Sequence, residues 1–301
     1  MSITGSPASP EEIAALAAEH GLELEAGSIS LTEMGLDFRV AFARSSDGRD
    51  WVLRIPRRPA VMDQAGVEDR LLEVIGPRLG FQVPDWLIRS QRLIAYRLLD
   101  GEPGLVLDAD GAPDWRVDVS APAYAASLGD LLAQLHGIDP AAVADTGIAI
   151  RSPEQVRQSW ADDLERVSAR FRIAVALHDP WRRWLDDDEL WPRRSALCHG
   201  EIYPGHTLVD DGRIVGLLDW TTASVGDPIQ DLMFHHATAS PEAFTLTLEH
   251  YRAGGGDPGP HLERRRAAMF SAAPLRYGSY ALETGEDEHR RAAAALLDPQ
   301  G

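Results

Sequence analysis

HGEIYPGH, at residues 199–206, is the stretch around which this chain is organised, and Asp219 directly follows the second of two apolar runs after it. The runs are TLVD at residues 207–210 and IVGLL at residues 214–218. Asp211-Gly212 lies between them, and Asp-Gly between two such runs is a strong signal for a β-hairpin. The sequence therefore predicts a short loop followed by a hairpin.

The predicted hairpin brings polar side chains together at one end. His206, at the start of the first strand, is expected opposite residues 217–219 of the second strand. Glu201, His206 and Asp219 are therefore predicted to converge. This set indicates phosphoryl transfer, with His206 and Asp219 holding Mg²⁺ on nucleotide phosphates and Glu201 orienting an attacking hydroxyl as the catalytic base.

Two other interpretations of the loop remain. Taken singly, Glu201 could be a solvated carboxylate and His206 a turn residue. A hydrolytic metal site built from His199, Glu201 and His206 is also conceivable, but its i, i+2, i+7 spacing does not match the helical His-Glu-x-x-His arrangement. The phosphoryl-transfer interpretation is preferred.

These motifs resemble those of the antibiotic kinases of the aminoglycoside and macrolide phosphotransferase group. That group has a His-Gly-Asp loop, a metal ligand five residues after the Asp, and an apolar strand ending in Asp. An Asn is usual at the metal-ligand position. His206 stands there in this chain, and with LLDWTTASVGDPIQD at residues 217–231 this variant resembles the macrolide 2′-phosphotransferases. The chain departs from the group at Glu201, where an Asp is usual.

The resemblance implies an α+β, two-lobed, protein-kinase-like fold. A small N-terminal lobe, residues 1–100, would bind the nucleotide on a five-stranded antiparallel sheet. A mainly helical C-terminal lobe, residues 101–301, would carry the catalytic and substrate-binding residues. The residue pattern itself predicts strands at 28–33, 37–44, 50–55, 87–89 and 92–99 and helices at 10–20, 65–79, 122–136, 153–172, 177–188 and 260–299.

Arg54 holds the position where a kinase has its strand lysine. The sequence contains no lysine, because all 29 basic residues are arginine. Arginine binds phosphate through a bidentate fork but is not equivalent to lysine. Glu68 resembles the helix glutamate that pairs with the strand cation, and Glu73 is the competing candidate. Gly35 is the further predicted phosphate contact, in a loop that lacks the G-x-G-x-x-G pattern.

The strand at residues 92–99 resembles the approach to a kinase hinge. Backbone groups of Arg97, Leu98 and Leu99 are then expected to bind the purine edge of the nucleotide. The alternative is an edge strand followed by a polar turn.

The resemblance also implies residues that support the loop or contact the substrate. Asp231, which is expected to open a helix at residues 231–239, resembles the structural aspartate that, with His199, supports the catalytic loop, and a plain carboxylate at a helix N-terminus is the alternative. The segment at residues 271–289 resembles the lining of the antibiotic pocket. The expected substrate contacts are Tyr203, Tyr277, Tyr280 and Glu283, and helix packing with a solvated acid is the alternative for the last three.

Composition limits the partners. The formal charge of −18 argues against a nucleic-acid partner and favours a cationic small molecule. No run of 18 apolar residues is present, so no membrane span is expected. The N-terminus lacks a secretory signal, and the single cysteine, Cys198, excludes an intrachain disulfide and is expected to be buried. We therefore expect a cytoplasmic monomer.

The predicted activity is transfer of the γ-phosphate of a nucleoside triphosphate to the 2′-hydroxyl of a macrolide's amino sugar, which inactivates the antibiotic. The residues indicate a kinase, whereas only the resemblance implies the macrolide and GTP, rather than ATP, as the donor. One alternative is an aminoglycoside or metabolite kinase of the same fold. The other is a nucleotide-binding protein without transferase activity, because Glu201 is one methylene longer than the usual side chain and the lysine is missing.

Overall fold

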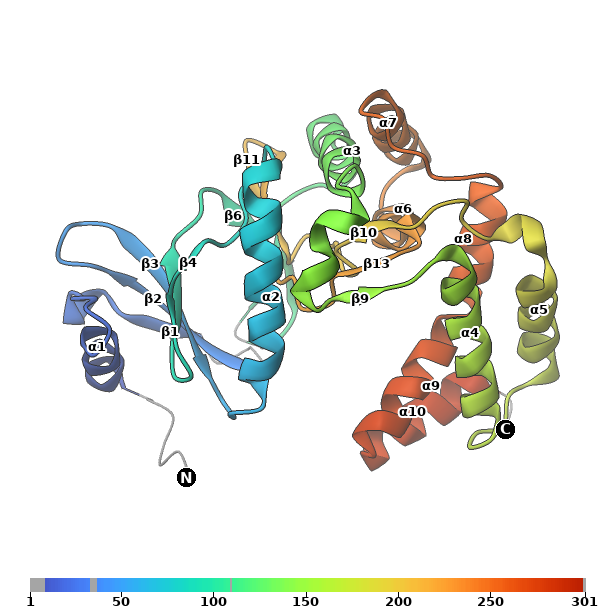
Figure 1. The fold of residues 1–301 in the computed structure, drawn as a ribbon, viewed down its shortest axis with the longest axis horizontal. Coiled ribbons are helices and arrows are strands. Elements are labelled where there is room, and N and C mark those ends of the chain that lie inside the picture. Colours follow the sequence, from blue (N-terminus) through green and yellow to red (C-terminus); the bar gives the residue numbers. More distant parts are fainter. Residues whose placement is uncertain (1–8, 33–36, 109, 300–301) are drawn as a thin grey trace. The chain divides into compact units, whose positions relative to one another are not determined.

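The computed structural model describes residues 9–32, 37–108 and 110–299. Its elements form two compact units, each made of several chain segments (Figure 1). The first unit contains Met1–Tyr124, Ala141–Ile148 and Tyr203–Thr222, and the second contains Ala125–Pro140, Ala149–Ile202 and Ala223–Gly301. The segment with the predicted hairpin thus belongs to the first unit, and a division into lobes at residue 100 remains a prediction.

The described part of the first unit contains a five-stranded antiparallel sheet, as predicted. The strand order is β1-β2-β3-β5-β4. The strands are β1 Ser30–Thr32, β2 Phe38–Arg44, β3 Asp50–Pro56, β4 Trp86–Arg89 and β5 Ile94–Arg97.

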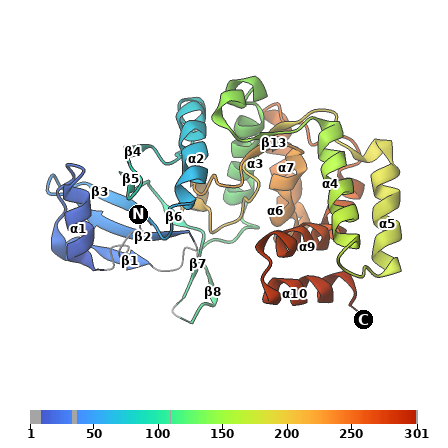
Figure 2. The same ribbon diagram turned by 60° about the horizontal axis from the view of Figure 1, so that its bottom comes forward.

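Alternation along the strands separates two faces of this sheet. Ala41, Leu53 and Ala95 share one buried cluster with Ile13 and Leu16 of helix α1 (Pro10–Ala18). The opposite face meets helix α2 (Val61–Ile75), and Figures 1 and 2 show the two helices on opposite sides of the sheet. Side chains of β3 that alternate with Leu53 therefore point toward α2.

The predicted hairpin is present in the first unit. β11 (Thr207–Asp210) pairs antiparallel with β12 (Arg213–Leu217), and β6 (Glu102–Pro103) pairs with the other edge of β11. Asp211 and Gly212 make the turn with φ values of 45° and 72°. Leu218 N–H donates to the His206 carbonyl at 2.8 Å, so His206 lies opposite the end of β12 as expected. A second, short hairpin joins β7 (Leu105–Leu107) and β8 (Pro113–Trp115).

The second unit is mainly helical. Most of α3 (Pro122–His136) belongs to it. Its other helices are α4 Pro153–Ser168, α5 Val175–Asp186, α6 Met233–Thr238, α7 Pro241–Ala253, α8 Leu262–Ser271, α9 Ala273–Thr284 and α10 Asp287–Leu297. The stretch predicted as helical at 260–299 is therefore divided into α8, α9 and α10. Trp160, Trp184 and Trp191 pack together in the core of this unit.

A small sheet in the second unit leads to the loop that is predicted to be catalytic. β10 (Ala196–Cys198) pairs antiparallel with β13 (Ser224–Gly226), which pairs in parallel with β9 (Ala149–Ile150). All three residues of β10 are buried, Cys198 among them, as expected for this thiol. Burial also raises the pKa of Cys198 well above its ordinary value.

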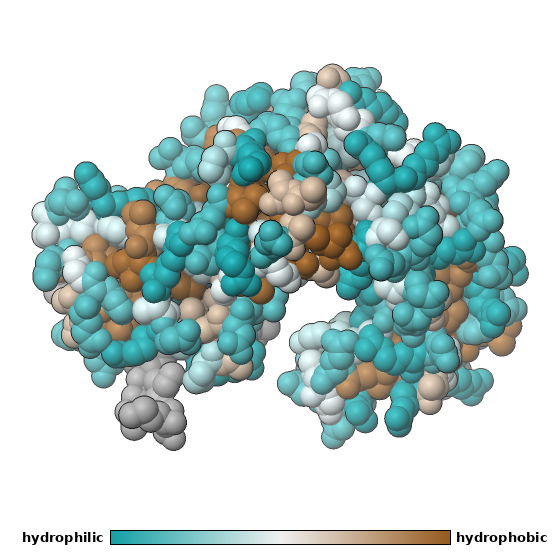
Figure 3. Space-filling model, viewed as in Figure 1, coloured by the Kyte–Doolittle hydropathy of each residue, from teal (hydrophilic) through white to brown (hydrophobic). Residues whose placement is uncertain are grey.

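Polar residues dominate the visible surface. On the face drawn in Figure 3 hydrophilic residues predominate, and hydrophobic residues appear in separate patches. None of the helices in the described ranges has both the length and the apolar character needed to cross a membrane.

Candidate active site

A buried ion pair joins β3 to α2 in the first unit. Nη1 of Arg54 donates to both carboxylate oxygens of Glu68, at 3.0 and 3.2 Å. The Glu68 side chain is only 1% exposed. Burial raises the pKa of Glu68, and the neighbouring Arg54 guanidinium opposes that rise. Glu73, the competing candidate, instead forms an ion pair with Arg89.

Two aromatic rings hold the Arg54 guanidinium. Its Cζ atom lies 4.3 Å from the ring centroid of Phe38 and 5.5 Å from that of Trp86. Cation–π contacts of this kind contribute about 0.5–2 kcal/mol each. The sequence analysis missed both rings, because no motif or spacing links them to Arg54.

His206 and Asp219 lie side by side at the open end of the β11–β12 hairpin. His206 Nε2 is 3.6 Å from Asp219 Oδ2. Asp219 has a φ of 60°, an uncommon conformation for a residue with a Cβ, and such strain concentrates at functional sites. The Thr221 hydroxyl, which the sequence analysis also missed, donates to Asp219 Oδ1 at 2.5 Å. Burial acts to raise the pKa of Asp219, but Thr221, His206 and Arg54 outweigh it, so this pKa lies below its ordinary value.

The donor atoms of this pair fit a magnesium ion. Thr221 bonds to Oδ1 of Asp219, whose side chain is 43% exposed, and Oδ2 faces His206. Mg²⁺ prefers oxygen ligands and keeps several waters, so direct ligation suits Asp219 and contact through a water suits His206.

Tyr203 lies against His206. The two ring centroids are 4.4 Å apart in an edge-on contact, and His206 N–H donates to the Tyr203 carbonyl at 2.9 Å. Tyr203 therefore restricts how the His206 ring can turn. Its predicted contact with the substrate stays a prediction.

The predicted hinge residues follow β5 or end it. Leu98 N–H donates to the Asp50 carbonyl at 3.0 Å, so the sheet already uses that donor. The Leu99 amide makes no hydrogen bond within the described residues. Arg97 points its guanidinium at Trp51, with Cζ 3.8 Å from a ring centroid. Gly35, the predicted phosphate contact, lies outside the described residues.

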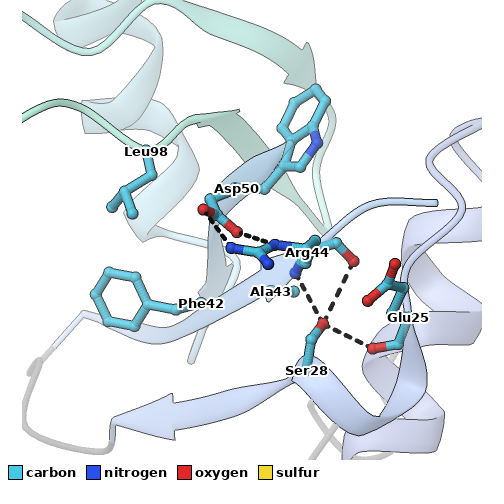
Figure 4. Close-up of a pocket in the computed structure, with 8 residues that line it drawn as sticks. Glu25, Ser28, Phe42, Ala43, Arg44, Asp50 and Leu98 are labelled. Carbon is cyan, nitrogen blue, oxygen red and sulfur yellow. Dashed lines mark hydrogen bonds and ion pairs between the residues drawn. The ribbon is translucent and has the colours of Figure 1, made fainter. Parts of the chain in front are cut away.

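A cavity of about 230 Å³ lies beside Leu98 (Figure 4). An ion pair crosses it, because Nε and Nη2 of Arg44 donate to the two carboxylate oxygens of Asp50 at 2.9 and 3.0 Å. Phe42 and Leu98 add exposed apolar surface. The lining residues are Glu25, Ser28, Phe42, Ala43, Arg44, Asp50, Trp51 and Leu98.

The loop at residues 199–201, which the sequence predicts to be catalytic, lies in the second unit, and Asp231 holds its backbone. The Asp231 carboxylate accepts the backbone N–H of His199 at 2.8 Å and that of Gly200 at 2.7 Å. Glu201 is exposed at the surface of this unit, and its N–H donates to His199 Nδ1 at 3.3 Å. Asp231 was expected to open a helix, but it lies within a 3₁₀ turn, Pro228–Leu232, that precedes α6.

The α9 side chains expected at the substrate already have partners. The Tyr277 hydroxyl lies 3.0 Å from His289 Nδ1, and the Tyr277 and Tyr280 rings are stacked with centroids 6.2 Å apart. Tyr280 is 44% exposed. Glu283 forms an ion pair with Arg166 at 3.0 Å. An exposed aromatic surface is therefore present, while the Glu283 charge is partly neutralised.

Known proteins resemble this chain over nearly its full length. A model of the phosphotransferase enzyme family matches residues 28–268. The crystal structure of macrolide 2′-phosphotransferase MphH from Brachybacterium faecium is 56% identical, with a TM-score of 0.94 over 97% of this chain and 98% of that chain. A macrolide 2′-phosphotransferase type I is 38% identical, with a TM-score of 0.87 over 99% of each chain. A GDP complex of an aminoglycoside 2′-phosphotransferase, 16% identical with a TM-score of 0.73 over 96% of each chain, shares the fold.

Proposed function

Because this chain belongs to the phosphotransferase enzyme family, we propose that it transfers the γ-phosphate of a nucleoside triphosphate to the 2′-hydroxyl of a macrolide's amino sugar. The observation that carries the macrolide is the 56% identity to a macrolide 2′-phosphotransferase across almost the whole of both chains. The same likeness confirms the predicted protein-kinase-like α+β fold. Phosphorylation at that hydroxyl inactivates the antibiotic.

The nucleotide is proposed to lie along the α2-facing side of the first sheet. Arg54 is fixed there by Glu68 and two rings, and its remaining N–H groups suit phosphate oxygens. The Leu99 amide, which makes no hydrogen bond within the described residues, is proposed to donate to the purine edge. GTP is the proposed donor on the strength of the resemblance, and ATP is its competitor in the test.

Mg²⁺ is proposed to bind Asp219 directly and His206 through water. When bound, it would neutralise charge on the phosphate oxygens. Thr221 keeps Asp219 ionised and oriented for this task by donating to the other carboxylate oxygen.

Glu201 is proposed to orient the attacking hydroxyl and to accept its proton. Phosphoryl transfer passes through a loose transition state, so the carboxylate mainly positions the nucleophile. Four residues separate Glu201 from His206, and five extended residues span at most about 18 Å. That span is an upper limit on the separation of the two residues along the chain. All the proposed groups come from one chain, and the monomeric state stays a prediction.

The macrolide is proposed to contact the aromatic surface at Tyr280 and the ring of Tyr203. Aromatic surface suits a large apolar lactone ring. Glu283 is proposed to attract the protonated dimethylamino group, although its ion pair with Arg166 weakens that attraction.

A phosphotransfer assay tests this function. GTP and ATP are each offered with a panel of macrolides and aminoglycosides, and the product is identified by mass spectrometry and NMR. We expect a phosphate on the 2′-hydroxyl of macrolides and faster transfer from GTP. If phosphate is transferred to aminoglycosides alone, the chain is an aminoglycoside kinase and the macrolide assignment is wrong. If neither donor supports transfer, the alternative of a nucleotide-binding protein without transferase activity remains.

A further inference from the structure

We infer that two buried side chains of the second unit, Tyr251 and Arg265, form a two-armed support that positions the catalytic loop, and that the glycine-rich segment 254–260 is shaped to enclose them. The inference rests on the proposed function, because the positioned loop carries Glu201. It assigns a role to residues far from the loop in the sequence.

The first arm is a line of hydrogen bonds that starts on α7. The Tyr251 hydroxyl is 2.8 Å from His136 Nδ1, and His136 Nε2 is 3.1 Å from Asp231 Oδ2. All three residues are buried. A carboxylate only accepts, so Nε2 donates to it, and the other ring nitrogen, Nδ1, lies against the Tyr251 hydroxyl. Asp231 in turn holds the backbone of His199 and Gly200.

The second arm is a buried ion pair. Nη2 of Arg265, on α8, donates to both carboxylate oxygens of Asp227 at 2.6 Å. Asp227 Oδ1 also accepts the Ile229 N–H at 3.1 Å, which caps the 3₁₀ turn that carries Asp231. Arg265 is 1% exposed and Asp227 is 4% exposed, so the pair is shielded from water. Arg265 therefore fixes the start of the turn whose fourth residue holds the loop.

One segment closes over both arms. A Cβ at Gly256 would lie 2.1 Å from the Tyr251 ring, so only glycine allows this approach. Gly259 has a φ of +77°, and a Cβ there would lie 2.5 Å from Arg265 Nη1. The Pro258 carbonyl accepts from the same Nη1 at 2.8 Å. The sequence GGGDPGP thus encloses these two side chains.

The two arms meet at the backbone that carries the base. β10 leads into the catalytic loop and β13 leads into the 3₁₀ turn, and the two strands pair from Ala196↔Gly226 to Cys198↔Ser224. A shift of the turn moves the Asp231 carboxylate, and with it the amides of His199 and Gly200. Misplacement of a catalytic group by ~1 Å can cost about a hundredfold in rate.

Tyr251→Phe tests the first arm, since it removes one hydroxyl and keeps the ring. Thr247→Val is the matched control, one turn earlier on α7. Its hydroxyl is also buried, but it bonds to the Ala125 carbonyl and His235 and not to Asp231. We expect single-turnover transfer to fall about tenfold in Tyr251→Phe and to stay at the parent rate in Thr247→Val, with nucleotide and macrolide affinities unchanged in both.

Arg265→Lys tests the second arm, because lysine keeps a charge near Asp227 but lacks the fork that also reaches Pro258. We expect the same loss of rate. Amide hydrogen exchange supplies a readout that does not depend on activity: the His199 and Gly200 amides should exchange faster in both arm variants than in Thr247→Val.

Parent rate and parent exchange in Tyr251→Phe would overturn the inference, whether or not Arg265→Lys folds. If the two variants lose stability but show no selective change in transfer rate or in exchange of the His199 and Gly200 amides, Tyr251 and Arg265 only contribute to packing. If the parent transfers no phosphate at all, the proposed function fails, and faster exchange at His199 and Gly200 would still establish the support.

Discussion

Arg54 supplies a planar guanidinium at the strand position where the resemblance predicts the compact ammonium group of a lysine. Phe38 and Trp86 contact the guanidinium and Glu68 accepts from its Nη1, so the group is held in place for the proposed contact with phosphate. We expect Arg54→Lys to weaken nucleotide binding by about ten- to a hundredfold, as loss of a charge-assisted hydrogen bond implies, with little change in macrolide affinity. Calorimetric titration with a non-hydrolysable nucleotide measures both.

Arg92→Lys is the control for Arg54→Lys, because Arg92 forms a surface ion pair with Glu19. It should leave nucleotide affinity at the parent value. Equal nucleotide affinity in the parent and Arg54→Lys would make Arg54 a purely structural partner of Glu68.

Glu201 carries the second prediction at this scale. Glu201→Gln should lose most of its turnover while keeping nucleotide affinity, because the amide can neither accept the proton nor orient the hydroxyl as a carboxylate does. Glu201→Asp should keep part of the activity, since its carboxylate survives with a shorter reach. Single-turnover phosphotransfer at saturating donor tests both variants. If Glu201→Gln transfers phosphate at the parent rate, Glu201 is not the base.

His235 gives a prediction about pH. Burial lowers its pKa from 6.5 to about 4, so between these values the unfolded chain binds a proton that the folded chain does not. The free energy of unfolding should therefore fall by up to about 3 kcal/mol as the pH drops from 7 to 4, and this loss should level off below pH 4. Urea titrations at several pH values should show a flatter dependence in His235→Gln. If the free energy of unfolding depends on pH equally in the parent and in His235→Gln, His235 does not cause the loss of stability at low pH.

At the scale of elements, the periodicity of the sequence predicted the strands and helices that are long enough to show a repeat. The sequence alternates around Val40 and is mostly apolar around Arg54, and the structure has both stretches as the seven-residue strands β2 and β3. The Asp-Gly turn fixed the hairpin that places His206 opposite the end of β12. Period-2 and period-3.6 patterns need several repeats, and these elements supply them.

Shorter elements and distant contacts escaped prediction. β9, β10 and β13 have two or three residues each, too few for a period to appear. The 3₁₀ turn around Asp231 looked like the start of a helix, because both begin with a capping aspartate and apolar residues. His136 and Tyr251 are far apart in the sequence, and no spacing rule joins residues that only tertiary packing brings together.

Two glycines inside helices lead to opposite predictions for one substitution. A Cβ at Gly129 of α3 would lie 2.4 Å from the Thr247 carbonyl oxygen, where α7 packs closely, so Gly129→Ala should cost about 1–3 kcal/mol. A Cβ at Gly66 of α2 would meet only Arg70 Nη1 at 3.6 Å, so Gly66→Ala should gain up to about 1 kcal/mol from helix propensity. Chemical denaturation measures both, and a shift of the same sign in the two variants would refute this account.

At the scale of the whole molecule, the net charge favours a role for a cation. The chain carries −18, which repels an anionic nucleotide unless positive charge offsets it locally. We expect excess chelator to abolish transfer and added Mg²⁺ to restore it, with the unfolding temperature unchanged because the cores contain no metal ligand of this site. Asp219→Ala should lose more turnover than His206→Ala. Chelator already saturated with Mg²⁺ is the control, and full activity in free chelator would exclude the metal site.

The labelling rate of Cys198 can report how often the strand β10 opens. Cys198 is the sole thiol of the chain, fully buried in β10, and its burial keeps it protonated and unreactive. Because Cys198 is buried, we expect a thiol-specific reagent to reach it only in molecules that have opened locally around β10. Because β10 leads directly into the loop with Glu201, the labelling rate measures how often this strand opens, in protein that carries no substitution and no engineered thiol.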